Sequence, residues 1–451
     1  MRWTHEVVLA ALTLPGSEVP GPHVYPSIST DTRTLEPGAL FVAIAGDRFD
    51  GHAHLVQARE RGALGAVVHE GTESVPGLVM YHVSDTVRAL GRLAHARRRE
   101  IPGPVIAITG TNGKTSTKEM MAAALATRYR THRTAANENN LIGVPLTLLQ
   151  APEGTEAVVV EAGASVPGEI GRYRQIIQPE IAIVTNTVAG HLEGFGSLEG
   201  VLAEKLSLTD GVPLAVVGTE PPALAQGARE RADRIVTAGL EAADLVPEAC
   251  SLEPDGRARV RVDGVEFLLA VPGAHQAGNA MLVWAVAREL GLDLAAVGVA
   301  LGQFSLPGGR VEMVQHGRLS VLNDCYNANP QSFRAAIALA AALRADRRLV
   351  FVAGTMRELG DREAALHVEV AGELAALNPE LLVAVGAFGP ALAGHAAHFG
   401  SRLLVAPDAP TAGPMLAPLL RGDELVVLKA SRGVALERIL PAITLRALPL
   451  H

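Results

Sequence analysis

Residues 109–117, Thr-Gly-Thr-Asn-Gly-Lys-Thr-Ser-Thr, have the residue types of a phosphate-binding loop. Glycines let the backbone approach an anion closely, and the N–H groups of the loop then point at phosphate oxygens. A lysine adds a full positive charge, and a threonine hydroxyl suits Mg²⁺. We therefore expect phosphate to bind at Gly110, Thr111, Asn112, Gly113, Lys114, Thr115 and Ser116.

The flanking sequence predicts a strand before this loop and a helix after it. The run 105–108 is wholly apolar, and Met120, Met121, Ala124 and Leu125 recur at helical spacing. A helix that begins at the loop adds its own attraction for anions. The common P-loop has its first glycine where Ile108 stands, so this loop is shorter, and an ordinary glycine-rich turn is the alternative.

Polar residues follow two further predicted strands. The run 157–160 ends at Glu161, and the run 181–184 is followed by Thr185, Asn186 and Thr187. In open parallel sheets, ligands lie beyond the carboxyl ends of the strands, which places Glu161 and Asn186 near the phosphates. The carboxylate is a candidate Mg²⁺ ligand, and a surface glutamate is the alternative.

Lys205 is predicted to face the core, because it shares one helical stripe with Leu198, Val201, Leu202, Leu208 and Thr209. A buried ammonium is costly unless it is paired or chemically changed. The side chain therefore either extends to the surface or is modified, and a lysine carbamate would be an anionic metal ligand. His191 is either a metal ligand or a packed or exposed residue.

The composition restricts the class of protein. A chain of 451 residues should form about two or three domains. A net charge of −8 without a dense basic run argues against a nucleic-acid partner. Two cysteines suit a reducing cytoplasm, the N-terminus does not resemble a signal peptide, and the longest apolar run, 335–343, is too short for membrane insertion. We expect a soluble, cytoplasmic monomer.

The predicted fold class is α/β with three domains, at residues 1–98, 99–307 and 308–451. The central domain carries the phosphate loop on a parallel sheet, and residues 257–270 predict a hairpin turning at Asp263-Gly264. The last domain alternates strand and helix, which predicts a second parallel, Rossmann-like sheet with strands at 319–322, 349–353, 381–385, 403–405 and 425–428.

Other polar clusters have two interpretations each. Asp31-Thr32-Arg33 and Phe49-Asp50-Gly51-His52 suit a polar ligand or serve as turn and capping residues. The stretch 137–145 suits sugar, peptide or phosphate contacts, or is a loop without a ligand. Lys429, Ser431 and Arg432 would bind a carboxylate, or are solvated surface residues.

Together these motifs resemble the Mur ligases, ATP-dependent enzymes that add amino acids to the cell-wall precursor, over essentially the whole chain. The shortened phosphate loop is that family's own version. The stretches 137–145, 191–197 and 324–330 are most similar to the D-alanyl-D-alanine-adding branch. Gln276, Thr355 and Ala430 depart from the family's usual Asn, Asp and Gly.

The resemblance implies a UDP-precursor-binding first domain, a central ATP-binding domain and a C-terminal ligase domain. It implies ATP and Mg²⁺ as cofactors, UDP-N-acetylmuramoyl-tripeptide and D-alanyl-D-alanine as substrates, and an acyl-phosphate intermediate. The implied catalytic residues are Lys114, Lys205 and His191, and the implied metal-site residues are Thr115, Glu161, His191 and Lys205.

The resemblance also implies that His275 and Asn279 lie near adenine, and that Arg310 and Asp324 reach ATP from the last domain. Expected substrate-binding residues are Asp31, Thr32, Arg33, Phe49, Asp50, Asn137, Asn140, Asn186, Thr187, Tyr326, Asn327, Lys429, Ser431 and Arg432. One rival is a folylpolyglutamate synthase-like ligase, which lacks the UDP-binding first domain. The other is a nucleotide-dependent switch without ligase activity.

Overall fold

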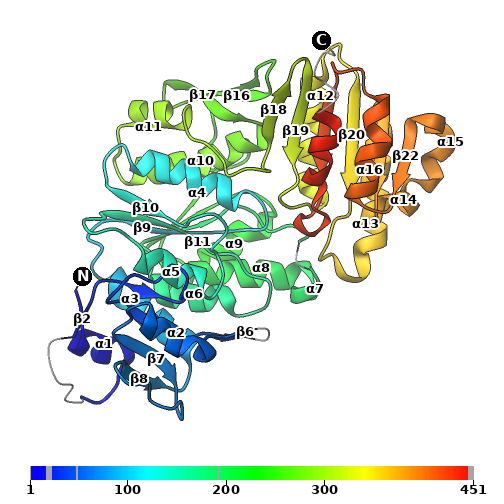
Figure 1. Ribbon diagram of the computed structural model, residues 1–451. Coiled ribbons are helices and arrows are strands. Elements are labelled where there is room, and N and C mark those ends of the chain that lie inside the picture. The colour runs from blue at the N-terminus through cyan, green and yellow to red at the C-terminus, as the bar shows by residue number, and fades with distance from the viewer. Residues whose placement is uncertain (1, 17–22, 47–48, 191, 445–451) are drawn as a thin grey trace. The chain divides into compact units, whose positions relative to one another are not determined.

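The computed structural model describes residues 2–16, 23–46, 49–190 and 192–444 (Figure 1). These residues form two compact units. The first contains the described residues of 1–109, 128–164 and 168–182, and the second contains those of 110–127, 165–167 and 183–451. The phosphate loop from Gly110 onward belongs to the second unit, and the three domain ranges given above stay a prediction.

A four-stranded parallel sheet forms the N-terminal part of the first unit. Its order is β3 (Ile28–Ser29), β4 (Leu40–Val42), β7 (Gly65–His69) and β8 (Val79–Val83). Residues of α1 (His5–Leu12) and α3 (Thr86–Arg98) pack in the core on one face, and α2 (Leu55–Glu60) contributes to a second core cluster. Two short antiparallel pairs accompany the sheet, namely β1 (Trp3–Thr4) with β2 (Val24–Tyr25), and β5 (Ala45–Gly46) with β6 (Phe49–Asp50).

The central sheet carries the loop-bearing strand. Its order is β10 (Thr131–Arg133), β11 (Ala157–Glu161), β9 (Val105–Thr109), β12 (Ile181–Val184), β13 (Leu214–Val217) and β14 (Ile235–Thr237). The predicted strands at 105–108, 157–160 and 181–184 are confirmed. The associated helices are α4 (Lys114–Leu125), α5 (Gly143–Leu149), α6 (Glu169–Ile177), α7 (Leu192–Phe195), α8 (Leu198–Leu206) and α9 (Pro222–Arg229).

The predicted hairpin is also confirmed, as β16 (Arg257–Val262) and β17 (Val265–Pro272), with β15 (Ala249–Leu252) as a third antiparallel strand. Its two turn residues, Asp263 and Gly264, have φ values of 49° and 72°, which a two-residue hairpin turn of this hand requires. Trp284 of α10 (Ala274–Glu289) stacks on Phe267 and donates to Asp263. Helix α11 (Leu294–Leu301) follows.

The C-terminal sheet contains every strand that the sequence predicted there. Its order is β18 (Glu312–His316), β19 (Leu319–Asp324), β23 (Leu425–Lys429), β20 (Leu349–Gly354), β21 (Leu381–Val385) and β22 (Leu403–Ala406). The expectation of a purely parallel sheet is wrong at one edge, because β18 pairs antiparallel with β19. As an edge strand, β18 is only half-buried and polar, so it lacks the apolar run that marked the others.

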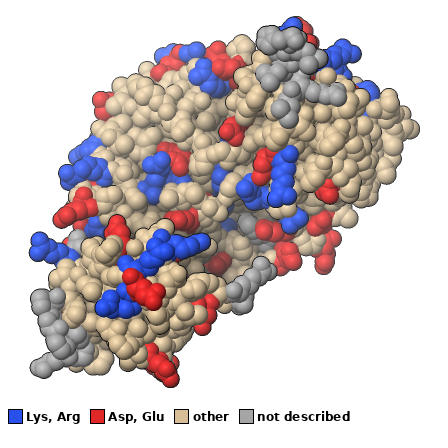
Figure 2. Space-filling model, in the orientation of Figure 1, with Lys and Arg blue, Asp and Glu red and all other residues tan. Residues whose placement is uncertain are grey.

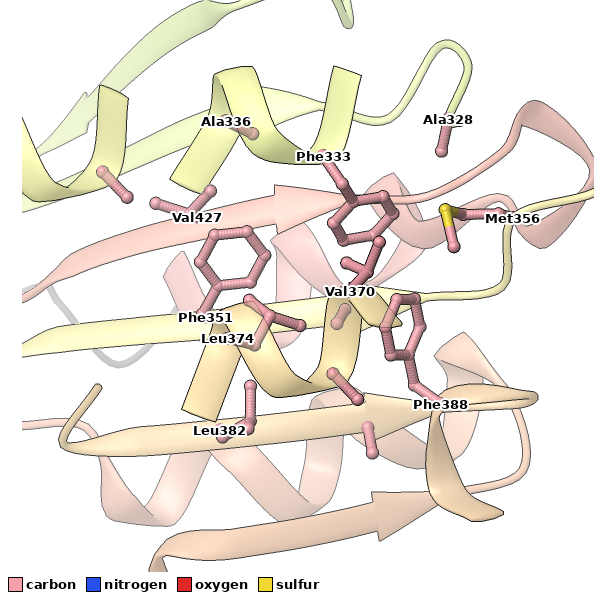
Figure 3. Close-up of a cluster of buried hydrophobic side chains, with 14 of the residues drawn as sticks. Ala328, Phe333, Ala336, Phe351, Met356, Val370, Leu374, Leu382, Phe388 and Val427 are labelled. Atoms are coloured by element: carbon pink, nitrogen blue, oxygen red, sulfur yellow. The ribbon is translucent and has the colours of Figure 1, made fainter. Parts of the chain in front are cut away.

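Helices cover both faces of this sheet. Helices α12 (Pro330–Arg344) and α13 (Glu363–Leu377) pack in one core cluster, and α16 (Ala409–Leu416) and α17 (Leu440–Thr444) in the other. Figure 3 shows Phe333 of α12 beside Phe351 and Phe388, with ring centroids 6.3 and 5.0 Å away. This aromatic contact fixes the first turn of α12 over the sheet. The short helices α14 (Phe388–Ala391) and α15 (Ala396–Phe399) complete the element order.

Charged side chains of both signs are intermixed on the face drawn in Figure 2, without an extended basic field. Within the described residues, none of the helices combines the length and apolar character that crossing a bilayer requires.

His367 connects α13 to the segment after β20. Its Nε2 accepts from the Met356 N–H at 2.9 Å, so Nδ1 carries the proton and donates to the Glu363 carbonyl at 2.7 Å. Burial lowers the pKa of His367 from its ordinary value of 6.5. The unfolded chain therefore binds the proton first as the pH falls. The stabilisation is complete above pH 6.5 and is lost as the pH falls through the folded-state pKa.

We predict that the free energy of unfolding decreases between about pH 7 and pH 5, and that His367→Gln makes this decrease smaller by about 1 kcal/mol for each unit by which the pKa is lowered. Urea unfolding at several pH values measures it. His398→Gln, at an exposed histidine, is the control. Identical pH dependences for the native chain and His367→Gln would contradict this role.

Candidate functional site

The two loop glycines are required by close approaches. Gly110 has a φ of 142°, and a Cβ atom there would lie 1.9 Å from the Thr185 hydroxyl oxygen. Gly113 has a φ of 80°, and a Cβ atom there would lie 2.5 Å from Asn279 Oδ1. The loop is therefore closely packed against the end of β12 at one glycine and against α10 at the other.

Hydrogen bonds hold the same loop to the residues after β12. The Thr111 N–H donates to the Asn186 carbonyl at 2.9 Å, and the Asn112 N–H donates to Asn186 Oδ1 at 3.0 Å. The Thr185 hydroxyl donates to the Asn112 carbonyl at 2.6 Å. Among the described residues, the buried Thr187 hydroxyl has no hydrogen-bond partner, which leaves it available to a ligand oxygen. The predicted proximity of Asn186 to the loop is confirmed.

Lys114 is the first residue of α4 and directs its charge back into the loop. Its ammonium donates to the carbonyls of Gly110 and Thr111 at 2.8 and 3.0 Å. Thr115 and Ser116 follow in the first turn and are buried. A full positive charge, a helix N-terminus and a glycine-bounded backbone therefore meet at one place, which is the arrangement that binds phosphate.

Arg310 reaches the loop from the C-terminal part of the chain. Its Nη2 donates to the Thr115 hydroxyl at 3.0 Å, and its guanidinium carbon lies 3.3 Å from the centroid of the Tyr326 ring. The Tyr326 N–H donates to the Gly309 carbonyl at 2.9 Å, which fixes the ring under the arginine. A second cation is thus present at the phosphate loop.

Lys429, predicted either to bind a carboxylate or to be solvated, is buried. Its ammonium donates to Asp324 Oδ2 at 2.6 Å and to the Asn327 carbonyl at 2.8 Å. Ser431 is also buried, and its hydroxyl donates to the Ala328 carbonyl at 3.3 Å. The solvated interpretation holds instead for Arg432, whose side chain is 65% exposed and pairs with Glu437.

Lys205 faces the core as predicted, and it does not extend to the surface, because it is only 1% exposed. Its ammonium lies 5.3 Å from the centroid of the Phe195 ring. The stripe is not uniformly buried, because Leu198 is 41% exposed. The carbamate stays a prediction, and His191 lies outside the described residues.

In the first unit, Glu161 is buried at the end of β11, so the surface-glutamate alternative is wrong. The Asn139 side chain donates to Glu161 Oε1 at 2.9 Å, and the Glu161 N–H donates to the Thr134 hydroxyl at 2.9 Å. Asn140 accepts from the N–H groups of residues 142 and 143 and so serves the start of α5, whereas Asn137 is exposed. Asn139 therefore orients the Glu161 carboxylate, whereas Asn140 stabilises the turn at the start of α5.

Residues 31–33 and 49–52 make turn and capping contacts, which is one of the two interpretations of these stretches. Arg33 Nη2 donates to Asp31 Oδ2 at 2.6 Å, and the Arg33 N–H donates to Asp31 Oδ1 at 2.9 Å. These hydrogen bonds lower the pKa of Asp31 to about 2. The Thr32 hydroxyl donates to Gln57 Oε1 at 2.8 Å. Asp50 accepts from the His52 N–H, and Phe49 is 53% exposed. The Phe49 ring stacks on His54, with the ring centroids 5.3 Å apart. Ligand binding by these residues stays a prediction.

At the start of α10, Gln276 stands where the family usually has Asn. The Asn279 amide donates to Gln276 Oε1 at 3.2 Å, so the longer side chain still contacts the residue that packs on the loop. His275 is exposed, and its ring lies over the backbone of Gly273. Their contact with adenine stays a prediction.

Models of one family match most of the chain. "Mur ligase family, catalytic domain" matches residues 24–98, "Mur ligase middle domain" matches 108–287, and "Mur ligase, glutamate ligase domain" matches 309–432. The chain belongs to the Mur ligase family.

Individual relatives extend over nearly the whole length. UDP-N-acetylmuramoyl-tripeptide–D-alanyl-D-alanine ligase of Bacillus subtilis (strain 168) is 36% identical over 428 residues, which are 91% of this chain and 92% of that one. A crystal structure of MurF from Acinetobacter baumannii has a TM-score of 0.88 at 28% identity, covering 98% and 99% of the two chains. MurF ligase from Thermotoga maritima, in complex with ADP, has a TM-score of 0.81 at 25% identity, covering 93% and 97%. The predicted α/β fold class and ligase family are confirmed.

Within the described residues, no group of three or more His, Cys, Asp or Glu side chains is arranged to hold a metal ion. The second unit of this Mur ligase has the buried Thr115 hydroxyl at the phosphate loop, which is an oxygen donor of the kind that suits a hard cation such as Mg²⁺. Taken by itself, the first unit has the buried Glu161 carboxylate, which is also an oxygen donor. Mg²⁺ keeps several waters and binds few carboxylates plus substrate phosphates, whereas Zn²⁺ needs nitrogen or sulfur ligands.

Sequence reasoning missed several residues around these groups. Thr185 was noted only as a residue after a predicted strand, and Asn139 only as part of the stretch 137–145. The packing of Gly110 against Thr185, and of Gly163 against Asn139, depends on the tertiary structure. Asn329 and Gln331 hydrogen-bond to the loop residue Asn112 from more than two hundred positions away, and no local pattern marks such a contact.

We predict that Gly110→Ala weakens ATP binding at least tenfold, because the new Cβ would displace Thr185 and strain a positive φ. Titration calorimetry with ATP measures it. Gly211→Ala is the matched control, because Gly211 also has a positive φ, 65°, but has open space around its Cβ position. Equal ATP affinity in Gly110→Ala and the native chain would contradict the packing account of the loop.

Proposed function

We propose that this Mur ligase joins D-alanyl-D-alanine to UDP-N-acetylmuramoyl-tripeptide at the expense of ATP, giving the UDP-linked muramoyl pentapeptide of peptidoglycan synthesis. The observation that carries this proposal is the 36% identity to a ligase of that name over 91% of the chain. The ADP-bound relative and the phosphate loop supply independent support for the nucleotide. Because residues 24–98 match a Mur ligase model, we favour this substrate over a folylpolyglutamate-type one.

In the first step, a carboxylate oxygen of the tripeptide attacks the γ-phosphorus of ATP. A new P–O bond forms, the bond to the β-phosphate oxygen breaks, and ADP leaves. The protein's part is to align the reactants and to compensate negative charge. Lys114 inside the loop and Arg310 at Thr115 are the cations placed to do so.

In the second step, the amine nitrogen of D-alanyl-D-alanine attacks the acyl carbon. A C–N bond forms, the tetrahedral intermediate collapses, and phosphate leaves with the original carboxylate oxygen, while the amine releases a proton. We assign Tyr326 and Asn327 to contact the dipeptide. Lys429 holds their segment through Asp324 and the Asn327 carbonyl.

We further propose that Mg²⁺ binds at Thr115 together with phosphate oxygens, with Glu161, His191 and Lys205 completing the metal sites. When bound, the ion neutralises charge on the transferring phosphoryl group. In this structure the Thr115 hydroxyl accepts from Arg310, so the same oxygen that would hold the ion is in contact with a cation that would pair with phosphate.

We also place the reaction in the cytoplasm. Both cysteines of the chain, Cys250 and Cys325, are free thiols, which suits a reducing compartment. The chain would act as a monomer, as the sequence led us to expect.

A substrate panel tests the function. We predict that the purified protein with ATP, Mg²⁺, UDP-N-acetylmuramoyl-tripeptide and D-alanyl-D-alanine gives a product of pentapeptide mass, and that omission of any one component prevents it. Lys114→Ala should lower turnover by about 10²-fold or more, because it removes a charge aimed at the transferring group. Arg318→Ala, at a side chain that is 85% exposed, is the control. Product formation without ATP, or near-native turnover in a folded Lys114→Ala, would overturn the proposal.

A further inference from the structure

The first turn of α12 is hydrogen-bonded directly to the phosphate loop. Asn329 Nδ2 donates to Asn112 Oδ1 at 2.7 Å, and Asn112 Nδ2 donates back to Asn329 Oδ1 at 3.2 Å. The same Asn112 amide donates to Gln331 Oε1 at 2.7 Å. Because Asn112 uses its backbone for Asn186 and Thr185, its side chain is left to serve α12 alone.

Gln331 extends this network beyond the loop. Its Nε2 donates to the Glu220 carboxylate, and the Glu220 carbonyl accepts from the Thr187 N–H at 3.0 Å. The contacts therefore close a ring through Asn112, Gln331, Glu220 and the residues after β12. Gly190 shares this packing, because a Cβ atom there would lie 2.6 Å from Thr111 Cγ2 and 3.6 Å from Asn329 Nδ2.

Asn329 is also the N-cap residue of α12. Its Oδ1 accepts from the Ser332 N–H at 2.9 Å, and its own N–H donates to the Ser332 hydroxyl at 3.0 Å, which is a capping box. A serine would cap this helix nearly as well as asparagine. Capping therefore does not require an amide at position 329, whereas the reciprocal pair with Asn112 does.

The segment just before Asn329 is held from its other side. Lys429 binds Asp324 and the Asn327 carbonyl, and Ser431 binds the Ala328 carbonyl. Residues 324–329 are thus hydrogen-bonded on one side to residues at and after the end of β23 and on the other side to the phosphate loop. The Asn329 end of the segment is hydrogen-bonded to the phosphate loop.

We propose that Asn329 and Gln331 are positioning residues that hold residues 324–329 and Arg310 in the correct position relative to the phosphate loop for the transfer steps. This inference rests on the proposed function, since it assigns the pair a role in that reaction. Neither residue belongs to the phosphate loop, residues 109–117. Their loss would misplace residues 324–329 and Arg310, while Lys114 and the loop backbone would still hold ATP. We therefore expect kcat to fall and the KM for ATP to stay nearly unchanged.

The test combines three variants in the ligase assay with measurement of thermal unfolding. Asn329→Ser keeps the cap but is too short to reach Asn112, and Asn112→Ser removes the same pair from the loop side. We expect each to lower kcat about tenfold, with less than about a twofold change in the KM for ATP in Asn329→Ser, which lies outside the phosphate loop. The double variant should lose no more kcat than either single variant. Ser332→Ala, which weakens the capping box but keeps the amide pair, is the matched control and should retain native kcat.

The outcomes separate the possible failures. If the native chain forms no pentapeptide, the proposed function fails. If the native chain is active and both single variants match it, or if the two losses multiply in the double variant, the positioning role fails. A loss of kcat in Ser332→Ala equal to that in Asn329→Ser would reduce Asn329 to a helix cap. Should Asn329→Ser not fold, Asn112→Ser with Gln331→Ala gives the same comparison from residues that do not cap α12.

Discussion

The site depends on one steric constraint, the contact of the Gly110 backbone with the Thr185 hydroxyl. A Cβ atom at 110 would lie 1.9 Å from that oxygen, so the loop closes against the end of β12 only because residue 110 has no side chain. From this contact follow the hydrogen bonds to Asn186, the inward direction of Lys114, and the presentation of Asn112 to α12. The loop is therefore held at the carboxyl ends of the strands by packing and hydrogen bonds, and such preorganisation is what charge stabilisation in catalysis requires.

Three lysines of this Mur ligase, the half-buried Lys114 and the buried Lys429 and Lys205, have different surroundings that suit different tasks. Lys114 donates to the backbone carbonyls of Gly110 and Thr111, which phosphate oxygens are able to replace. Lys429 is paired with a carboxylate, Asp324, and keeps a structural position. Lys205 lies against an aromatic ring in the core. A buried carboxylate follows the same rule, because Glu424 accepts from Arg348 and from three backbone N–H groups.

Local sequence predicted the strands that bear the site, because buried parallel strands are continuous apolar runs that end in polar residues, as β9, β11 and β12 do. It also predicted the burial of Lys205 from the helical stripe. It missed β18, because an edge strand needs no such run. It left Arg33 open between ligand and turn; the structure shows the turn contacts with Asp31, and ligand binding stays a prediction. Asn329 and Asn139 were missed because their partners depend on tertiary packing, which no spacing in the chain encodes.

The central claim is that the phosphate held at Lys114 is transferred to a carboxylate oxygen before the amide forms. Labelling the terminal carboxylate of the UDP-linked tripeptide with ¹⁸O and analysing the released phosphate by mass spectrometry tests it directly. Because phosphate leaves with the oxygen through which it was attached, the account predicts one labelled oxygen in each phosphate released per amide bond. Pentapeptide formation with unlabelled phosphate, or with the label in AMP, would contradict it.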